Sequence, residues 1–86
     1  MYGGGNFSGA NLKGVDAGAI SSWSKVNFQG ANLEGANFRG ADIDEVNFEQ
    51  ALLSGIRLEG ASYDTKTRWP KGFDPVAAVA GSGLEK

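Results

Sequence analysis

A repeat of five residues runs through most of this chain and limits what it can fold into. From residue 26 to residue 65, eight consecutive pentads keep one order: a small residue, a position most often filled by Asn or Asp, and a bulky apolar residue. On a helix each pentad would rotate the apolar position by about 140°, and on a strand it would move that position to the opposite face. The pattern therefore indicates a backbone that turns a corner at every repeat and keeps its apolar side chains inside.

The length of one coil can be read from a longer recurrence. The triplet VNF at residues 26–28 returns at residues 46–48, twenty residues later, so four pentads complete one coil and residues twenty apart lie above one another. Upstream, GNFSG at residues 5–9 and ANLKG at residues 10–14 join the same stack if one extra residue is accommodated by a bulge at residues 20–25. The predicted inward side chains are Phe7, Leu12, Phe28, Leu33, Phe38, Ile43, Phe48, Leu53, Leu58 and Tyr63.

The repeats resemble a known family. Pentads such as ANLEG at residues 31–35 and ANFRG at residues 36–40 are similar to the pentapeptide-repeat consensus A(D/N)LxX, and the resemblance covers residues 5–65. It implies an all-β solenoid, a right-handed quadrilateral β-helix with the central apolar residue and the preceding Ala inward. The repeats amount to about 2.7 coils, or roughly 13 Å at about 4.8 Å per coil. The segment at residues 63–75 resembles the ending of cyanobacterial members of this family.

The two ends of the chain are expected to differ. We expect residues 1–4 to be a flexible N-terminus, residues 5–65 to form the β-helix, and residues 66–86 to form a C-terminal cap. Asp74 followed by Pro75 suits an N-cap and a first helical turn, which predicts a short helix at residues 75–80, stopped by Gly81, and a loose end after it. An uncovered coil exposes its interior and unpaired backbone, so Trp69 and Phe73 are predicted to cover the last coil. The first coil has little before it and is predicted to be poorly covered.

Two apolar residues break the pattern on the expected outside. Trp23 falls in the bulge, and Leu52 replaces the outward Asn or Asp of its pentad. Trp is enriched among the residues that dominate binding energy, which makes both residues candidate interface anchors. Isolated surface hydrophobes are ordinary, so simple exposure or local cover remains the alternative for each.

The residue types present give little basis for catalysis. The chain has no His and no Cys, so the commonest general base, the commonest metal ligand and the thiolate nucleophile are missing. Asp42, Asp44, Glu45 and Asp64 form the one carboxylate cluster, and we interpret it as a solvated face. We therefore predict no catalytic residues, no metal site, no cofactor and no small-molecule substrate. The Asn side chains are predicted to bond the backbone or one another along the stack.

Charge and hydropathy limit the kinds of partner that the chain is expected to bind. Eight basic and ten acidic residues give a net charge of −2, which is too balanced to favour nucleic acid or an anionic membrane. No apolar run approaches the length of a membrane span, and the N-terminus lacks the features of a signal peptide. We expect a cytoplasmic protein, associated peripherally with thylakoid complexes if the cyanobacterial resemblance holds.

Two functional hypotheses remain. The first is a non-catalytic protein-interaction module, a small subunit, spacer or assembly factor of a larger complex, photosynthetic if the lineage resemblance holds. The second comes from the family resemblance, since some relatives inhibit type II topoisomerases by imitating duplex DNA. One turn of B-DNA is about 34 Å long. The short stack and the small net charge therefore favour the interaction module, with a protein partner whose identity the sequence does not give.

Overall fold

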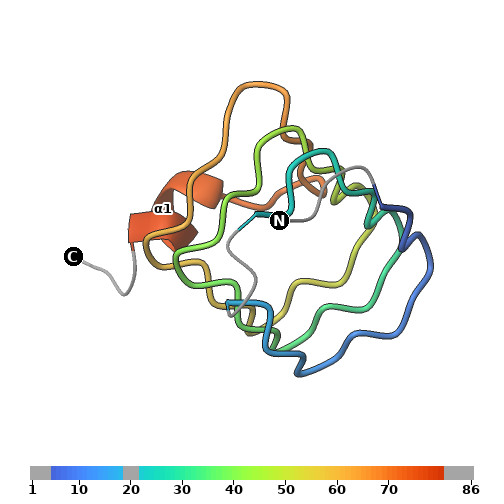
Figure 1. Ribbon diagram of the computed structural model, residues 1–86. Helices are drawn as coiled ribbons and strands as arrows, with labels where there is room; N and C mark the ends of the chain where they lie inside the picture. Colours follow the sequence, from blue (N-terminus) through green and yellow to red (C-terminus); the bar gives the residue numbers. More distant parts are fainter. Residues whose placement is uncertain (1–4, 19–21, 81–86) are drawn as a thin grey trace.

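The computed structural model describes residues 5–18 and 22–80, so the expectations for residues 1–4, for residues 20 and 21 of the bulge, and for residues 81–86 lie outside it. Figure 1 looks along the length of a coiled backbone, in which segments far apart in the sequence lie behind one another around a four-cornered outline. The described residues contain one helix, α1 (Pro75–Ala80). Their remaining backbone pairs through isolated parallel bridges, one on each side of each coil.

The bridges confirm the predicted register. Each side of the coil can be named by its last bridging residue: the Arg68, Leu52, Arg57 and Ser62 sides. Asn27 pairs with Asn47, and the other three sides likewise pair residues twenty apart. The earlier bridges on three sides span twenty-one, because one extra residue enters between Asp16 and Ser22. These bridges are Asn6 with Asn27, Asn11 with Asn32 and Asp16 with Asn37.

Most described pentads turn their corner by the same local chemistry. The Asn27 Oδ1 atom accepts a hydrogen bond from the Gln29 backbone N–H at 2.9 Å, and the Ala31 N–H closes the turn onto the Phe28 carbonyl at 2.9 Å. Asn suits this position because its short side chain can bond the backbone two residues on. Between these groups, Gly30 takes a left-handed conformation, with φ 70°. The expectation that the Asn side chains bond the backbone is confirmed, and it explains why Asn recurs every five residues.

The interior is filled by stacked apolar side chains. Phe28, Phe38 and Phe48 have no exposed surface, and small residues such as Ala31 and Val26 are equally buried at the preceding positions. Phe28 and Phe48 stack with ring centroids 5.7 Å apart and an interplanar angle of 10°. The alternation matters because a bulky residue at both positions would overfill a coil of this width. Phe7, Leu12 and Tyr63 are partly buried against this core, and the structure buries the other seven predicted inward residues.

The stack continues past residue 65, beyond the predicted end of the repeats. Arg68 bridges Asn47, a separation of twenty-one, so a second extra residue enters after Ser62. Thr67 then occupies a buried position that Val46 and Val26 fill in the two coils below, and Trp69 lies on Phe48. The sequence prediction ended the repeats too early because this insertion shifts the last pentad out of phase.

The chain leaves the coil through residues 69–74, which we call the closing segment. In Figure 1 this orange stretch crosses within the outline of the coils and ends in α1 on the opposite side. Asp74 Oδ1 accepts the Val76 and Ala77 N–H groups at 3.1 and 3.3 Å, which confirms the predicted N-cap before Pro75. Ala78 packs on the core, so α1 is held by the coil as well as by its cap.

Phe48 gives the most direct test of the inward assignment. Phe48→Ala removes a fully buried ring that contacts Phe28, Phe38 and Trp69, and should lower the free energy of unfolding by about 3–5 kcal/mol. Gln29→Ala, at an exposed position, should change it by less than about 0.5 kcal/mol. Denaturant titration of both variants measures the difference, and equal effects would contradict the assignment.

Candidate functional site

Trp23 does not lie on the outside, so the expectation of an outward bulge residue is wrong. The residue is 8% exposed, its Nε1–H donates to the Ala17 carbonyl at 3.1 Å, and its ring centroid lies 5.6 Å from that of Phe28 and 5.7 Å from that of Phe38. Ser22 bridges Asp42 on the adjacent coil, which places Trp23 in the central inward position of an in-phase pentad. The interpretation failed because Ser22 stands where Asn usually marks the repeat. Because Trp23 is buried in the core, it is not available as an interface anchor.

Aromatic rings stack at the C-terminal end of the core. Trp69 stacks on Phe48 with centroids 4.9 Å apart, Phe73 stacks on Trp69 at 5.1 Å, and Tyr63 meets Trp69 edge-on at 5.5 Å. Trp69 and Phe73 both come from the closing segment, and both keep part of their surface exposed. The geometry brings these two predicted lid residues together over the stack.

Leu52 is the exposed large apolar residue on the described part of the coil surface. Its residue surface is 53% exposed at the outward position where the coils below carry Asn32 and Asn11. The aliphatic Leu52 side chain has no oxygen to accept the backbone N–H two residues on, and Ser54 N–H indeed donates to no atom of the described residues. Leu52 therefore gives up the local bond that its counterpart Asn32 makes with Glu34, and it presents apolar surface to solvent.

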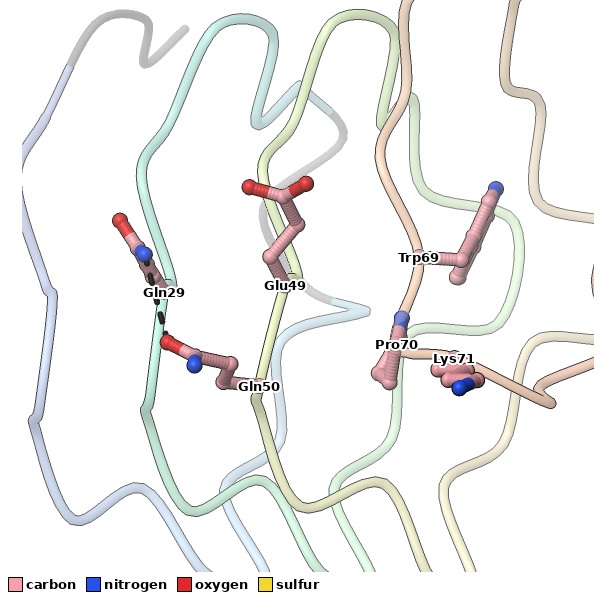
Figure 2. A pocket seen from close by; sticks show the side chains of 6 residues that line it. All are labelled: Gln29, Glu49, Gln50, Trp69, Pro70 and Lys71. Atoms are coloured by element: carbon pink, nitrogen blue, oxygen red, sulfur yellow. Dashed lines mark hydrogen bonds between the residues drawn. The ribbon is translucent and has the colours of Figure 1, made fainter.

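Two shallow clefts flank the closing segment beside Leu52. The first, of about 400 Å³, is shown in Figure 2: Gln29 and Gln50 face each other from neighbouring coils, 3.4 Å apart, with Glu49 beside them. The second, of about 360 Å³, is more apolar, and it lies between the last coil and the closing segment. Its lining includes Ala51, Leu53, Pro70, Lys71 and Phe73. The first cleft offers amides, one carboxylate and one ammonium group, which suit polar contact rather than bond-making chemistry.

The carboxylate cluster occupies one corner, where it serves the backbone. Asp42 Oδ1 accepts the Asp44 N–H at 3.1 Å, and Asp64 Oδ1 accepts the N–H groups of Glu45, Lys66 and Thr67 at 3.0–3.1 Å. Burial, then the charges of Asp42 and Asp64, raise the pKa of Asp44. In residues 5–18 and 22–80 no group of three or more acidic side chains is placed to hold a metal ion.

Thr67 is a structural residue that the sequence prediction missed. It is 7% exposed, and its hydroxyl donates to the Ile43 carbonyl at 2.9 Å. Asp64 N–H in turn lies 3.3 Å from the Thr67 oxygen, so the hydroxyl and the Asp64 carboxylate together satisfy the backbone of the enlarged corner. The signal was present in the sequence: residues 67–69 repeat the small, polar, bulky order, one residue out of phase.

Comparison with known proteins agrees with this geometry. A family model for pentapeptide repeats matches residues 24–61 in eight copies. A crystal structure of a pentapeptide repeat protein from Nostoc Pcc 7120 is 30% identical to this chain, with a TM-score of 0.62, and covers 86% of this chain and 77% of that one.

The chain belongs to the pentapeptide repeat family.

The family fold is the right-handed β-helix solenoid, which the bridged coils here reproduce. A pentapeptide repeat protein from the Arabidopsis thaliana thylakoid lumen is 31% identical, with a TM-score of 0.45, over 79% of this chain and 57% of that one. Another, from the cyanobacterium Cyanothece 51142, is 30% identical, with a TM-score of 0.41, over 78% of this chain and 45% of that one. Comparison with curated proteins gives no match. Among the described residues, no helix has the length and hydropathy needed to cross a bilayer.

The burial of Trp23 can be measured by fluorescence. In a Trp69→Phe variant, which isolates the Trp23 signal, emission should be blue-shifted and poorly quenched by iodide, because the indole is enclosed by Phe7, Phe28 and Phe38. Guanidinium-unfolded protein provides the control for an exposed indole. A red-shifted, readily quenched signal from the folded variant would return Trp23 to the surface.

The Asp64 corner should make stability depend on pH. Partial burial would raise the pKa of Asp64, but hydrogen bonds from Glu45, Lys66 and Thr67 outweigh it and hold the pKa below its ordinary value. The unfolded chain therefore takes up a proton first, so the stabilisation is full above about pH 4 and is lost as pH falls through the lower, folded value. Thermal melting from pH 6 to pH 2 should show this loss, and Asp64→Asn should flatten it.

Glu34→Gln is the matched control, because the Glu34 carboxylate makes no hydrogen bond or ion pair with the described residues. Its melting curve should keep the pH dependence of the unmodified chain. An Asp64→Asn variant that kept it as well would show that the corner carboxylate does not contribute.

Proposed function

We propose that this chain is a non-catalytic protein-interaction module, a small subunit, spacer or assembly factor whose contact surface includes the Leu52 side at the C-terminal end. One observation carries the proposal: an outward row that is Asn in two coils becomes a half-exposed Leu in the third, beside an apolar cleft. The substitution gives up a local hydrogen bond and exposes apolar surface, which burial in an interface would offset.

The coil suits docking because its backbone fixes the spacing of its outward side chains. Each bridged rung holds the next at about 4.8 Å, so a partner meets rows of side chains at set intervals. Little ordering is then needed on this side of the interface, which reduces the entropy that binding must overcome. The proposal includes Trp69 and Phe73 as the cap, on a stack longer than the predicted count of about 2.7 coils, because its bridges continue to Arg68.

The proposed host is a large photosynthetic assembly, with the module attached peripherally to thylakoid complexes from the cytoplasm. This part rests on lineage: the similar structure is that of a Nostoc protein, and the sequence at residues 63–75 resembles cyanobacterial endings. The partner is a protein rather than nucleic acid, since a net charge of −2 provides little attraction for phosphates and little imitation of them.

Site-specific photo-crosslinking tests the proposal. A photoreactive residue at position 52 should capture a discrete protein from a cyanobacterial extract. The same residue at position 11 should not, because it lies in the same outward row at the other end. Equal capture from both positions would contradict a surface centred on Leu52.

A gyrase supercoiling assay tests the competing function. We expect no inhibition at about micromolar concentration, because the chain lacks the charge of a duplex imitation. Inhibition at that level would replace the interaction module with DNA mimicry.

A further inference from the structure

We propose that the last rung of the Leu52 side receives an extended segment of a partner protein as one more parallel β-rung. The segment would carry two consecutive apolar residues followed by an acidic residue. This inference rests on the proposed interaction function and specifies how the partner binds.

The backbone of this rung has the donors and acceptor of a coil that should continue. One coil below, Leu33 N–H donates to the Leu52 carbonyl at 2.9 Å, and Gly35 N–H donates to the Ser54 carbonyl at 2.8 Å. The equivalent N–H groups of Leu53 and Gly55 donate to no atom of residues 5–18 and 22–80. An added strand in the same register would accept both bonds, and it would donate to the Ala51 carbonyl as Leu52 does to Ala31.

The side chains around the rung call for apolar residues on both faces of the added strand. Leu52 presents exposed apolar surface outward, so the outward residue of the strand would lie against it. The next residue would point inward, into the cleft of about 360 Å³ between Leu53 and Phe73. Successive residues of a strand point to opposite faces, so a consecutive apolar pair fills both positions.

Charge favours an acidic residue directly after the apolar pair. Lys71 lines the same cleft and forms no ion pair with the part of the chain that the structure describes. A carboxylate one residue after the pair would lie at the corner beside the Lys71 ammonium group. Such an ion pair at the rim adds modestly to affinity and fixes the direction of the strand.

A single strand fits this end better than a second copy of the coil. The closing segment runs across the core, with Trp69 stacked on Phe48 and Phe73 stacked on Trp69, and would obstruct a whole coil placed on top. The Arg68 side is already extended by Arg68 itself, and the other two sides end in polar Arg57 and Ser62. Among the sides that the structure describes, the Leu52 side alone combines an unpaired rung, an outward apolar residue and an apolar cleft.

The test uses a peptide built from this chain. Residues 30–36, GANLEGA, form a rung of the Leu52 side one coil below. The acetylated and amidated peptide GALLEGA replaces the outward Asn with Leu and keeps the inward Leu and the following Glu. Titrated into the ¹⁵N-labelled full chain, it should shift the Leu53 and Gly55 amide resonances saturably.

N-methylation separates strand pairing from hydrophobic adhesion. Methylating the first peptide leucine removes the N–H that donates to Ala51, and should weaken binding at least about tenfold. Methylating the second leucine alters an N–H that points away from the coil, and should leave binding within about twofold. Equal effects of the two modifications, no saturable binding at about 1 mM peptide, or shifts centred on another side would each overturn the proposal.

Protein variants check the side-chain contacts. Leu52→Asn, which restores the residue of the coils below, should weaken peptide binding several-fold, and Lys71→Gln should do so only for peptides that contain the Glu. Val76→Asn, at the other exposed large apolar position among the described residues, and Lys13→Gln, near the first coil, should have no effect. Unchanged binding by Leu52→Asn and Lys71→Gln would overturn the assignment of this rung.

Two further outcomes separate this inference from the function that it refines. If position 52 still crosslinks a partner protein but the peptide does not bind, the strand is wrong and the interaction module stands. If crosslinking from position 52 fails as well, the proposed function fails with it. A concentration-dependent dimer that shifts Leu53 and Gly55 without peptide would make the occupant a second copy and overturn the proposal.

Discussion

A single column of aromatic rings fixes how the coils sit on one another. Phe7, Phe28, Phe48, Trp69 and Phe73 stack in sequence, with centroid separations of 4.9–5.7 Å and interplanar angles of 10–20°. The successive separations along the chain from Phe7 to Trp69 are twenty-one, twenty and twenty-one residues. Both one-residue insertions therefore leave the column intact, because the extra residue is absorbed elsewhere in the coil. A slip of the inward positions would bury the polar residue of each pentad, so the column and the bridges enforce the same register.

The register set by the aromatic column requires a left-handed backbone conformation at most corners of the coil. Most corners place Gly in the left-handed conformation, but Lys25, Glu45 and Gln50 adopt it with φ of 60–66°, at a cost of about 1–2 kcal/mol each. Glu45 is tolerated because the Asp64 carboxylate accepts its N–H, replacing the carbonyl that the insertion has moved away. The Thr67 hydroxyl satisfies a second backbone group of this corner by donating to the Ile43 carbonyl. The acidic corner is thus explained by backbone satisfaction, even though it places Asp42, Asp44 and Asp64 close together and disfavours the ionised form of Asp44.

The sequence was most informative where every pentad carries its marker residues. Phe28, Leu33 and Phe48 could be placed inside, and α1 could be placed from Asp74 and Pro75, because each has a local physical signature. Trp23 and Thr67 could not be placed in the same way, since Ser22 and Arg68 stand where Asn marks the repeat, and an insertion precedes each of them. The period alone does not say which residue of a six-residue interval is the extra one. That choice is made by packing: the indole and the threonine hydroxyl each find buried partners only in the inward register.

The last coil of a solenoid leaves backbone groups unpaired, whereas the coils before it do not. Every side of a coil satisfies its backbone through the coils above and below, whereas the last coil has N–H groups facing outward along the axis. The chain covers this end unevenly: Arg68 adds a rung to one side, the closing segment covers the core, and α1 lies beyond it. A protein that only needed to avoid association would place a polar or charged residue at the remaining edge, as Ser62 and Arg57 do on two sides. Leu52 does the opposite at an edge that also borders the more apolar of the two clefts beside the closing segment. The loss of the Asn side-chain bond and the gain of apolar surface coincide with unpaired donors, and these three features together support the proposed docking edge.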